Sequence, residues 1–165
     1  MAKYKFSESL SSGVHKILKE LVGEWEGTAS TWFEPGKLAD ESSVNGKISS
    51  ILGGRFILHE YKGSIENKPL EGLNIIGFDC MTGKYQYAWV DSFHIGSAIM
   101  ISEGKPGNEK LDVMGHYDTN EEGTDKWGWR TELNIIDSNN ITITSFNVMP
   151  TGEEAKATEI NYKRR

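Results

Sequence analysis

The side chains that most often carry chemistry are few in this sequence, and their spacing does not match a metal site. The four histidines are His15, His59, His94 and His116. No two of them are separated by the short intervals that are typical of zinc-binding motifs. The single cysteine, Cys80, lies in a polar turn without a neighbouring histidine to activate it. One cysteine also excludes an intramolecular disulfide and a multi-cysteine metal site. We therefore expect no metal ion and no other cofactor.

Two further patterns resemble active-site motifs but lack the context that would support them. Asp91, Ser92 and His94 place an acid, a hydroxyl and an imidazole close together in the chain. Catalytic triads assemble in space rather than by adjacency, and no Gly-x-Ser-x-Gly elbow is present. The Gly53-Gly54 pair does not belong to a strand–GxGxxG–helix unit, so the sequence indicates no dinucleotide or phosphate loop.

Polar residues inside otherwise apolar runs are more informative. Alternation from Arg55 to Lys62 places His59 and Tyr61 on one face and Glu60 on the other. At least some of a group of five must point inward, where a charge needs a partner or water: His59, Glu60, Tyr61, Asp91 and Arg130. These residues form either a structural network with an outward polar face, or the polar lining of an aromatic-walled cavity. Alternation alone does not tell which face of each strand is internal.

These side chains must be positioned by strands, and the strongest strand signal is a β-hairpin over Gly72–Ser92. A β-branched run is followed by a polar turn at Asp79–Lys84 and by a second run in which large aromatics alternate with smaller residues. The aromatics of the second run are Tyr85, Tyr87 and Trp89. We interpret the rest of the chain as further hairpins on either side.

A single helix is expected before the strands. Apolar residues at a spacing of three and four predict a helix that begins at Ser11 or Ser12 and is stopped by Gly23. Residues 1–10 are predicted to be a loosely held arm, and residues 11–165 a single β-barrel domain.

After Gly23 the hydrophobic period changes to two, which predicts ten strands: Trp25–Phe33, Ser42–Ile51, Arg55–Ile65, Leu70–Phe78, Tyr85–Asp91, Ser97–Glu103, Lys110–Tyr117, Trp127–Ile136, Ile141–Met149 and Ala155–Lys163. Short turn signals between them force antiparallel neighbours. A meander exposes two edges unless it closes, so we predict an all-β, antiparallel up-and-down barrel. Closure of about ten strands predicts an internal cavity. A sandwich of two five-stranded sheets is the alternative.

A large aromatic, Trp25, opens the first predicted strand directly after the helix, and the chain ends in Tyr162-Lys163-Arg164. First and last strands are neighbours in a closed barrel. An arginine of the last strand could therefore stack over Trp25 and seal one end.

Composition limits the classes of function. The net charge is −6 and the only basic cluster is Lys163-Arg164-Arg165, which argues against a nucleic-acid-binding protein. No apolar run is long enough for a transmembrane helix, and residues 1–20 lack the apolar region of a signal peptide. We expect a cytoplasmic protein without a membrane span.

Five short motifs match one known family in order and spacing: Gly23-Glu24-Trp25 after a helix, Gly53-Gly54-Arg55-Phe56, Gly72 with Gly77-Phe78-Asp79, Trp89-Val90-Asp91-Ser92, and the terminal Glu159–Arg164. From about Val14 to Arg164 the chain resembles the bacterial family of uncharacterised proteins called domain of unknown function 1579. The resemblance implies a calycin-like, lipocalin-style barrel and no established activity. Haem-binding relatives of similar shape carry a late histidine ligand, and this sequence has no histidine after His116, which argues against haem.

Three functional hypotheses follow. The preferred one is non-enzymatic binding of a small, largely apolar molecule with a polar or acidic head, with walls from Tyr61, Tyr87, Trp89 and Trp129 and an anchor at Arg130. The second is an enzyme that uses the cavity for acid–base chemistry, with His59, Glu60 or Asp91 as weak catalytic candidates. The third is a structural or interaction domain whose barrel is filled by its own side chains. The sequence leaves a homodimer open.

Overall fold

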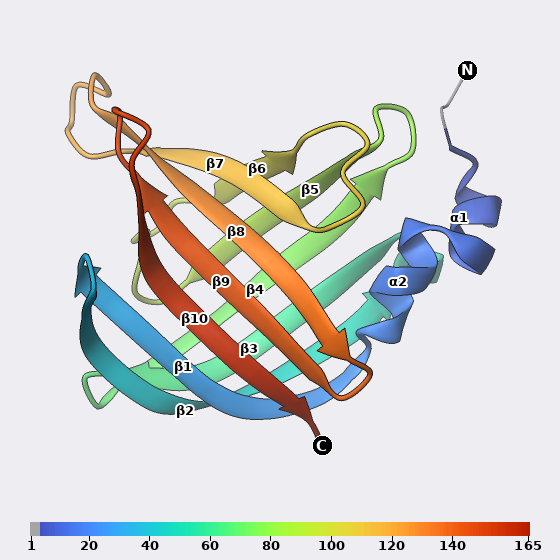
Figure 1. Cartoon of the computed structure of the whole chain (residues 1–165), viewed down its shortest axis with the longest axis horizontal. Helices are drawn as coiled ribbons and strands as arrows, with labels where there is room; N and C mark the ends of the chain where they lie inside the picture. Colours follow the sequence, from blue (N-terminus) through green and yellow to red (C-terminus); the bar gives the residue numbers. More distant parts are fainter. Residues whose placement is uncertain (1–3) are drawn as a thin grey trace.

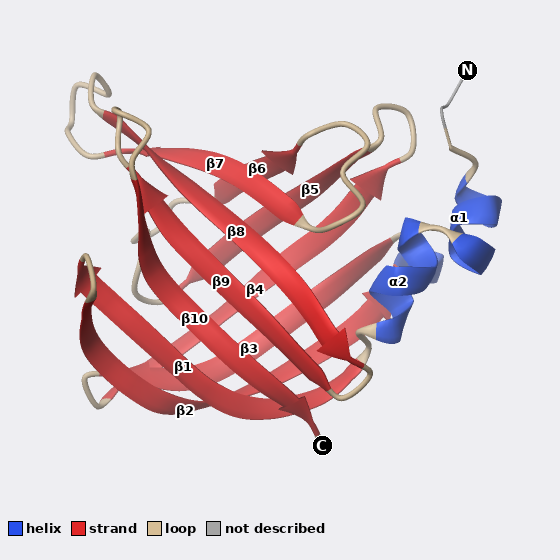
Figure 2. Cartoon of the chain, viewed as in Figure 1, coloured by secondary structure: helices blue, strands red, loops and turns tan. Residues whose placement is uncertain are grey.

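The runs of alternating residues form the strands predicted for them. The computed structural model describes residues 4–165, in which the strands are β1 (Gly23–Glu34), β2 (Lys37–Ile51), β3 (Phe56–Ile65), β4 (Lys68–Asp79), β5 (Lys84–Asp91), β6 (Met100–Gly104), β7 (Asp112–Asp118), β8 (Lys126–Asp137), β9 (Asn140–Val148) and β10 (Glu154–Arg164). Each strand pairs antiparallel with its sequence neighbours, and β1 also pairs with β10 (Figure 1, Figure 2). The predicted closed barrel is confirmed, and the two-sheet sandwich is excluded.

Two short helices precede the strands: α2 (Val14–Glu20) stands where the single helix was expected, and α1 (Phe6–Ser12) lies before it. A 3₁₀ turn, η1 (Leu52–Gly54), joins β2 to β3. Gly13 separates α1 from α2 in an extended conformation. A Cβ at Gly13 would lie 2.8 Å from the Cα of Ser9, so the corner needs glycine. Of the arm predicted over residues 1–10, residues 1–3 lie outside the described part of the chain and residues 6–10 belong to α1.

None of the described helices is both long and apolar enough to span a membrane. The helices instead lie at one end of the barrel, where α2 leads into β1 (Figure 2). We call this the helix end. The opposite end, which carries the β5–β6, β7–β8 and β9–β10 connections, is the loop end.

Trp25 seals the helix end, as predicted. Its side chain is buried, with 1% of the residue exposed, and its indole N–H donates to the Leu21 carbonyl over 3.0 Å. The guanidinium carbon of Arg164 lies 4.2 Å from the indole ring centroid. Arg164 also donates to the carbonyls of Glu20 and Val22. The last strand therefore holds both the first strand and the end of α2.

The two strands that close the barrel come very close together at Gly27. Gly27 of β1 stands opposite Tyr162 of β10. A Cβ added at Gly27 would lie 1.8 Å from the carbonyl oxygen of Asn161, a distance that no side chain tolerates. The seam therefore depends on a residue without a side chain.

Candidate functional site

The barrel interior keeps a small cavity of about 60 Å³ toward the loop end. Aromatic residues of three strands form much of its lining: Tyr61 of β3, Tyr87 and Trp89 of β5, and Trp129 of β8. Trp89 and Trp129 stack with their ring centroids 5.3 Å apart and their planes 19° from parallel. Because all four aromatics are buried, the cavity has rigid, flat walls.

A chain of hydrogen bonds runs from Trp89 to His94. The Trp89 indole N–H donates to the Tyr61 hydroxyl over 2.8 Å, and that hydroxyl donates to Asp91 Oδ2 over 3.4 Å. The same carboxylate oxygen lies 2.5 Å from Nδ1 of His94. The backbone amides of Phe93 and His94 donate to the other oxygen, Oδ1, so the turn after β5 is folded around the Asp91 carboxylate.

The charge of Asp91 follows from this geometry. Burial alone would raise the pKa of its carboxyl, but the hydrogen bonds and charge of His94 and the two backbone amides outweigh burial and lower the pKa. The nearby Tyr61 stays a neutral phenol, because burial and the negative charge of Asp91 raise its pKa well above the ordinary value. An ionised carboxylate only accepts hydrogen bonds, so Nδ1 of His94 carries a proton.

Two buried polar atoms of the cavity lining have no hydrogen-bond partner. In the described residues only three buried side-chain polar atoms are unpartnered, and two of them are Nε2 of His94 and Oδ1 of Asn74. Both residues line the cavity, and Asn74 is only 2% exposed. Because leaving buried polar groups unpaired costs free energy, two such atoms in one cavity indicate a place for a polar molecule.

A second polar group lies deeper in the barrel. His59 contacts Asn74 Nδ2 through Nδ1 (3.2 Å) and the Tyr162 hydroxyl through Nε2 (3.1 Å). Burial lowers the pKa of His59 to about 4, although the hydrogen bond with Asn74 acts in the opposite direction. His59 is therefore neutral near pH 7, and the Asn74 amide links it to the cavity.

The structure brings most of the predicted site residues together. Tyr61, Tyr87, Trp89 and Trp129 line the cavity, together with His59. Asp91 lies behind His94. Glu60 is exposed on the outer face of β3, beside a shallow groove of about 850 Å³.

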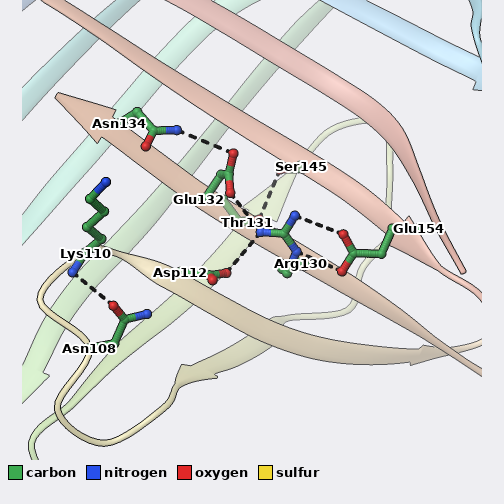
Figure 3. A network of polar contacts seen from close by, with 9 residues as sticks. All are labelled: Asn108, Lys110, Asp112, Arg130, Thr131, Glu132, Asn134, Ser145 and Glu154. Atoms are coloured by element: carbon green, nitrogen blue, oxygen red, sulfur yellow. Dashed lines mark hydrogen bonds and ion pairs between the residues drawn. The ribbon is translucent and has the colours of Figure 1, made fainter. Parts of the chain in front are cut away.

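Arg130 does not lie among the cavity residues, so its expected role as an anchor for a ligand in the cavity is corrected. Its neighbour Thr131 points inward, and Arg130 itself points outward and stacks over Phe146. Its guanidinium pairs with three acidic side chains on the outer surface, from Glu154, Glu132 and Asp112 (Figure 3). These bonds, led by those to Glu154, raise the pKa of Arg130.

The candidate site residues that sequence reasoning missed are His94 and Asn74. His94 follows Asp91 in a short loop, where no periodic pattern reports burial. The signal that could have found it is Asp-x-x-His at the end of a strand, because an aspartate in that place folds the next turn back onto its own side chain. Asn74 is an amide inside an apolar strand, the same signal that drew attention to His59.

The loop end is covered in part by an aromatic contact. Phe33 of β1 stacks on Phe93 of the β5–β6 loop, with ring centroids 6.2 Å apart and planes 24° from parallel. Phe93 in turn packs edge-on against His94. We call the Phe33–Phe93 contact the aromatic latch.

Metal-binding geometry is absent from the part of the chain that is described. No group of three or more His, Cys, Asp or Glu side chains there could hold a metal ion. That folding needs neither metal nor haem stays a prediction.

A closed barrel of ten antiparallel strands around a small cavity is the architecture of the calycin-like proteins. Within this class the chain belongs to the DUF1579 family, described as proteins of unknown function, whose model matches residues 11–164. The family resemblance of the sequence motifs is thereby confirmed.

Two solved structures share the fold. The S-type phycobiliprotein lyase CPES from Guillardia theta is 12% identical, with a TM-score of 0.53 over 98% of each chain. Rv2717c from M. tuberculosis is 10% identical, with a TM-score of 0.59 over 93% of this chain and 98% of that one. At such low identity the similarity concerns the fold alone. Comparison with curated proteins gave no match.

Proposed function

We propose that this protein binds a small molecule in the cavity at the loop end. The observation that carries the proposal is the pairing of stacked indole walls with two unpartnered polar atoms in one enclosed space. Flat aromatic walls bind planar or apolar groups, and the polar atoms orient them.

The size of the cavity limits the ligand. Pockets for drug-sized molecules measure roughly 300–1,000 Å³, and this cavity measures about 60 Å³. It accommodates a compact molecule, or the head of a longer one once the β5–β6 loop moves aside. Arg130 was expected to bind an acidic head group of the ligand. It cannot do so in this cavity, because it lies outside the barrel.

The proposal is tested by titrating purified protein with compact aromatic probes, namely phenol, indazole and benzamide, and following tryptophan fluorescence. We expect saturable changes in the wild type and weaker binding by His94→Phe, which removes the polar atom and keeps an aromatic ring. His116→Phe is the matched control, because His116 is exposed on β7. No saturable response to any probe, or equal affinities in the wild type and His94→Phe, contradicts the proposal.

A second candidate function, acid–base catalysis, is favoured by one observation. An imidazole that is oriented by a carboxylate and presents a free Nε2 is the arrangement of a general base. Asp91 would then position His94, which would exchange a proton with the bound molecule. Chemical conversion of a bound probe by the wild type, lost in His94→Gln while binding persists, would distinguish an enzyme from a binding protein.

A further inference from the structure

A row of apolar side chains crosses the outer wall of the barrel from β3 to β6. The register places Leu58 opposite Ile75, Ile75 opposite Ala88, and Ala88 opposite Ile101. The chain neighbours of all four residues are buried, so alternation directs the four side chains outward. Ile75 is 39% exposed and Ile101 is 62% exposed. We call these four residues the apolar row.

Leu73 and Val90 widen the apolar row on one side. They stand opposite each other on β4 and β5 and also lie on the outer face. Both border the shallow groove of about 850 Å³, so the wall is hollowed beside them, whereas Ile101 projects from β6. We call the apolar row together with Leu73 and Val90 the apolar face.

The apolar face is a local feature of the outer surface. The opposite wall of the barrel is formed by β8 to β10 and presents polar side chains that bond to one another. Those of β8 and β10 are Arg130, Glu132, Asn134, Glu159 and Asn161. A polar outer wall is what a barrel exposed to water requires, so an apolar wall on one side needs another explanation.

The size of the apolar face suits the core of an interface between two proteins. With strands about 4.8 Å apart and outward residues about 7 Å apart along each strand, the face covers roughly 300 Å². The largest apolar patches on monomers measure roughly 300–600 Å² and are often functional. A standard interface buries about 800 Å² of each partner and surrounds an apolar core with a polar rim. The apolar face is large enough for such a core when the neighbouring polar residues supply the rim.

The charges around the apolar face favour a second copy of this chain as the partner. Three lysines there stand beside or opposite an acid: Lys62 with Glu71, Lys84 with Glu103, and Lys47 with Glu60. The first two are ion pairs of 3.7 Å and 3.5 Å, at opposite ends of the strands. A partner of opposite charge would be selected by a rim of one sign, but this rim carries both signs at each end. An identical copy carries the same mixture, so neither end of the face meets a rim of like charge.

We propose that two copies of this chain associate through the apolar face, so that the outer walls of β3 to β6 pack against each other. A two-fold arrangement brings the projecting Ile101 of each copy toward the hollow beside Leu73 and Val90 of the other. The contact also covers β6, a strand of five residues whose register with β7 comprises three residue pairs. Association therefore stabilises the part of the barrel that has few backbone pairs. The inference does not depend on the proposed function, because the cavity lies on the inner side of the same strands.

Sedimentation velocity of the full chain, from about 1 µM to about 1 mM, tests the association. We expect the mass to rise from that of one chain to that of two over this range. The midpoint of thermal unfolding should rise with protein concentration over the same range, because association stabilises the folded state. A single-chain mass at the highest concentration, or an open-ended assembly in place of a dimer, overturns the inference.

Variants on the surface test which face is used. Ile101→Glu should raise the Kd of the dimer at least about tenfold, because it buries an unpaired charge in the interface twice. Ile136→Glu is the matched control, because Ile136 of β8 is 66% exposed and lies outside the apolar face. Circular dichroism checks the fold of both variants. A dimer that Ile101→Glu leaves intact, or that Ile136→Glu weakens equally, uses another face and overturns the inference.

The wild type provides a measurement that does not depend on how a variant folds. When the protein is diluted through the transition, the methyl NMR signals of Ile75 and Ile101 should shift, and those of Ile135 and Ile136 should stay constant. Ile135 and Ile136 are the comparison because they are exposed on β8, away from the apolar face. Shifts confined to Ile135 and Ile136 place the contact elsewhere and contradict the inference.

Discussion

A buried neutral histidine makes the stability of this fold depend on pH. Burial lowers the pKa of His59 to about 4 in the folded protein, against the ordinary 6.5. Between these values the unfolded chain binds a proton that the folded chain does not, so stability falls as the pH falls from about 6.5 to about 4. The pKa difference corresponds to about 3 kcal/mol.

Urea unfolding between pH 7 and pH 4 measures this effect. His59→Gln, which keeps a hydrogen-bonding group toward Tyr162, should lose stability less steeply than the wild type over that range. Some dependence remains, because the pKa of the buried His15 is also lowered. The exposed His116→Gln should behave like the wild type. Equal slopes for the wild type and His59→Gln would show that His59 does not cause the acid sensitivity.

Trp25 should be among the costliest single residues to truncate. Its ring is buried, hydrogen-bonded to Leu21 and covered by Arg164. We expect Trp25→Ala to lower the free energy of unfolding by about 3–5 kcal/mol, the range for removing a buried large aromatic. Trp32→Ala is the control, because Trp32 is only half-buried and contacts Lys156 from one side. Comparable losses from the two variants in denaturant melts would contradict the sealing role.

At the residue scale, the sequence predicted the walls of the candidate site better than its polar groups. Trp89 and Trp129 alternate with smaller or polar residues, which placed each of them on one face of its strand; that both faces are internal is shown by the structure. Glu132 lies two residues after Arg130 and therefore on the same face of the strand. Two charged residues on one face indicate a face that is exposed to solvent. Hydrophobic periodicity did not predict the burial of His94, because that burial depends on how a loop folds over the barrel end.

At the element scale, the seam between β1 and β10 makes a sharp prediction. A Cβ at Gly27 would overlap the backbone carbonyl of Asn161, and backbone cannot move aside as a side chain can. We expect Gly27→Ala to cost at least about 3 kcal/mol, at the upper end of overpacking effects. Gly63→Ala is the comparison, since its nearest atom would lie 3.1 Å away. Urea melts that show equal losses for both would mean that the seam tolerates a side chain.

The strands could be predicted from the sequence, but the break between α1 and α2 at Gly13 could not, and the reason is physical. Period-two alternation and turn residues repeat along the whole barrel, so each strand is specified locally. The apolar spacing around α2 runs on past Gly13, and one glycine costs a helix only about 1 kcal/mol. The break coincides instead with the packing of Gly13 on Ser9 and with the Ser9–His15 hydrogen bond, contacts between α1 and α2 that hydrophobic spacing does not report.

At the scale of the whole molecule, closure follows from a simple requirement. Every strand edge must be paired or protected, and a short-turn meander of ten strands meets this by pairing β1 with β10. The same reasoning predicted that a cavity exists. Its volume could not be predicted, because it depends on how far the aromatic side chains of β5 and β8 reach across the interior.

We expect the aromatic latch at the loop end to control how quickly a guest of the proposed binding site exchanges with solvent. Phe33 and Phe93 are both partly exposed, so their separation costs little, and on this prediction it precedes passage of the guest into the barrel. Phe33→Ala should therefore raise the association and dissociation rate constants together and leave their ratio nearly unchanged. Stopped-flow tryptophan fluorescence with the tightest probe measures both, with Leu38→Ala on the same hairpin as the control. Unaltered rates would place the entrance elsewhere. If the prediction holds, the latch sets the residence time of a guest and the cavity behind it sets the affinity.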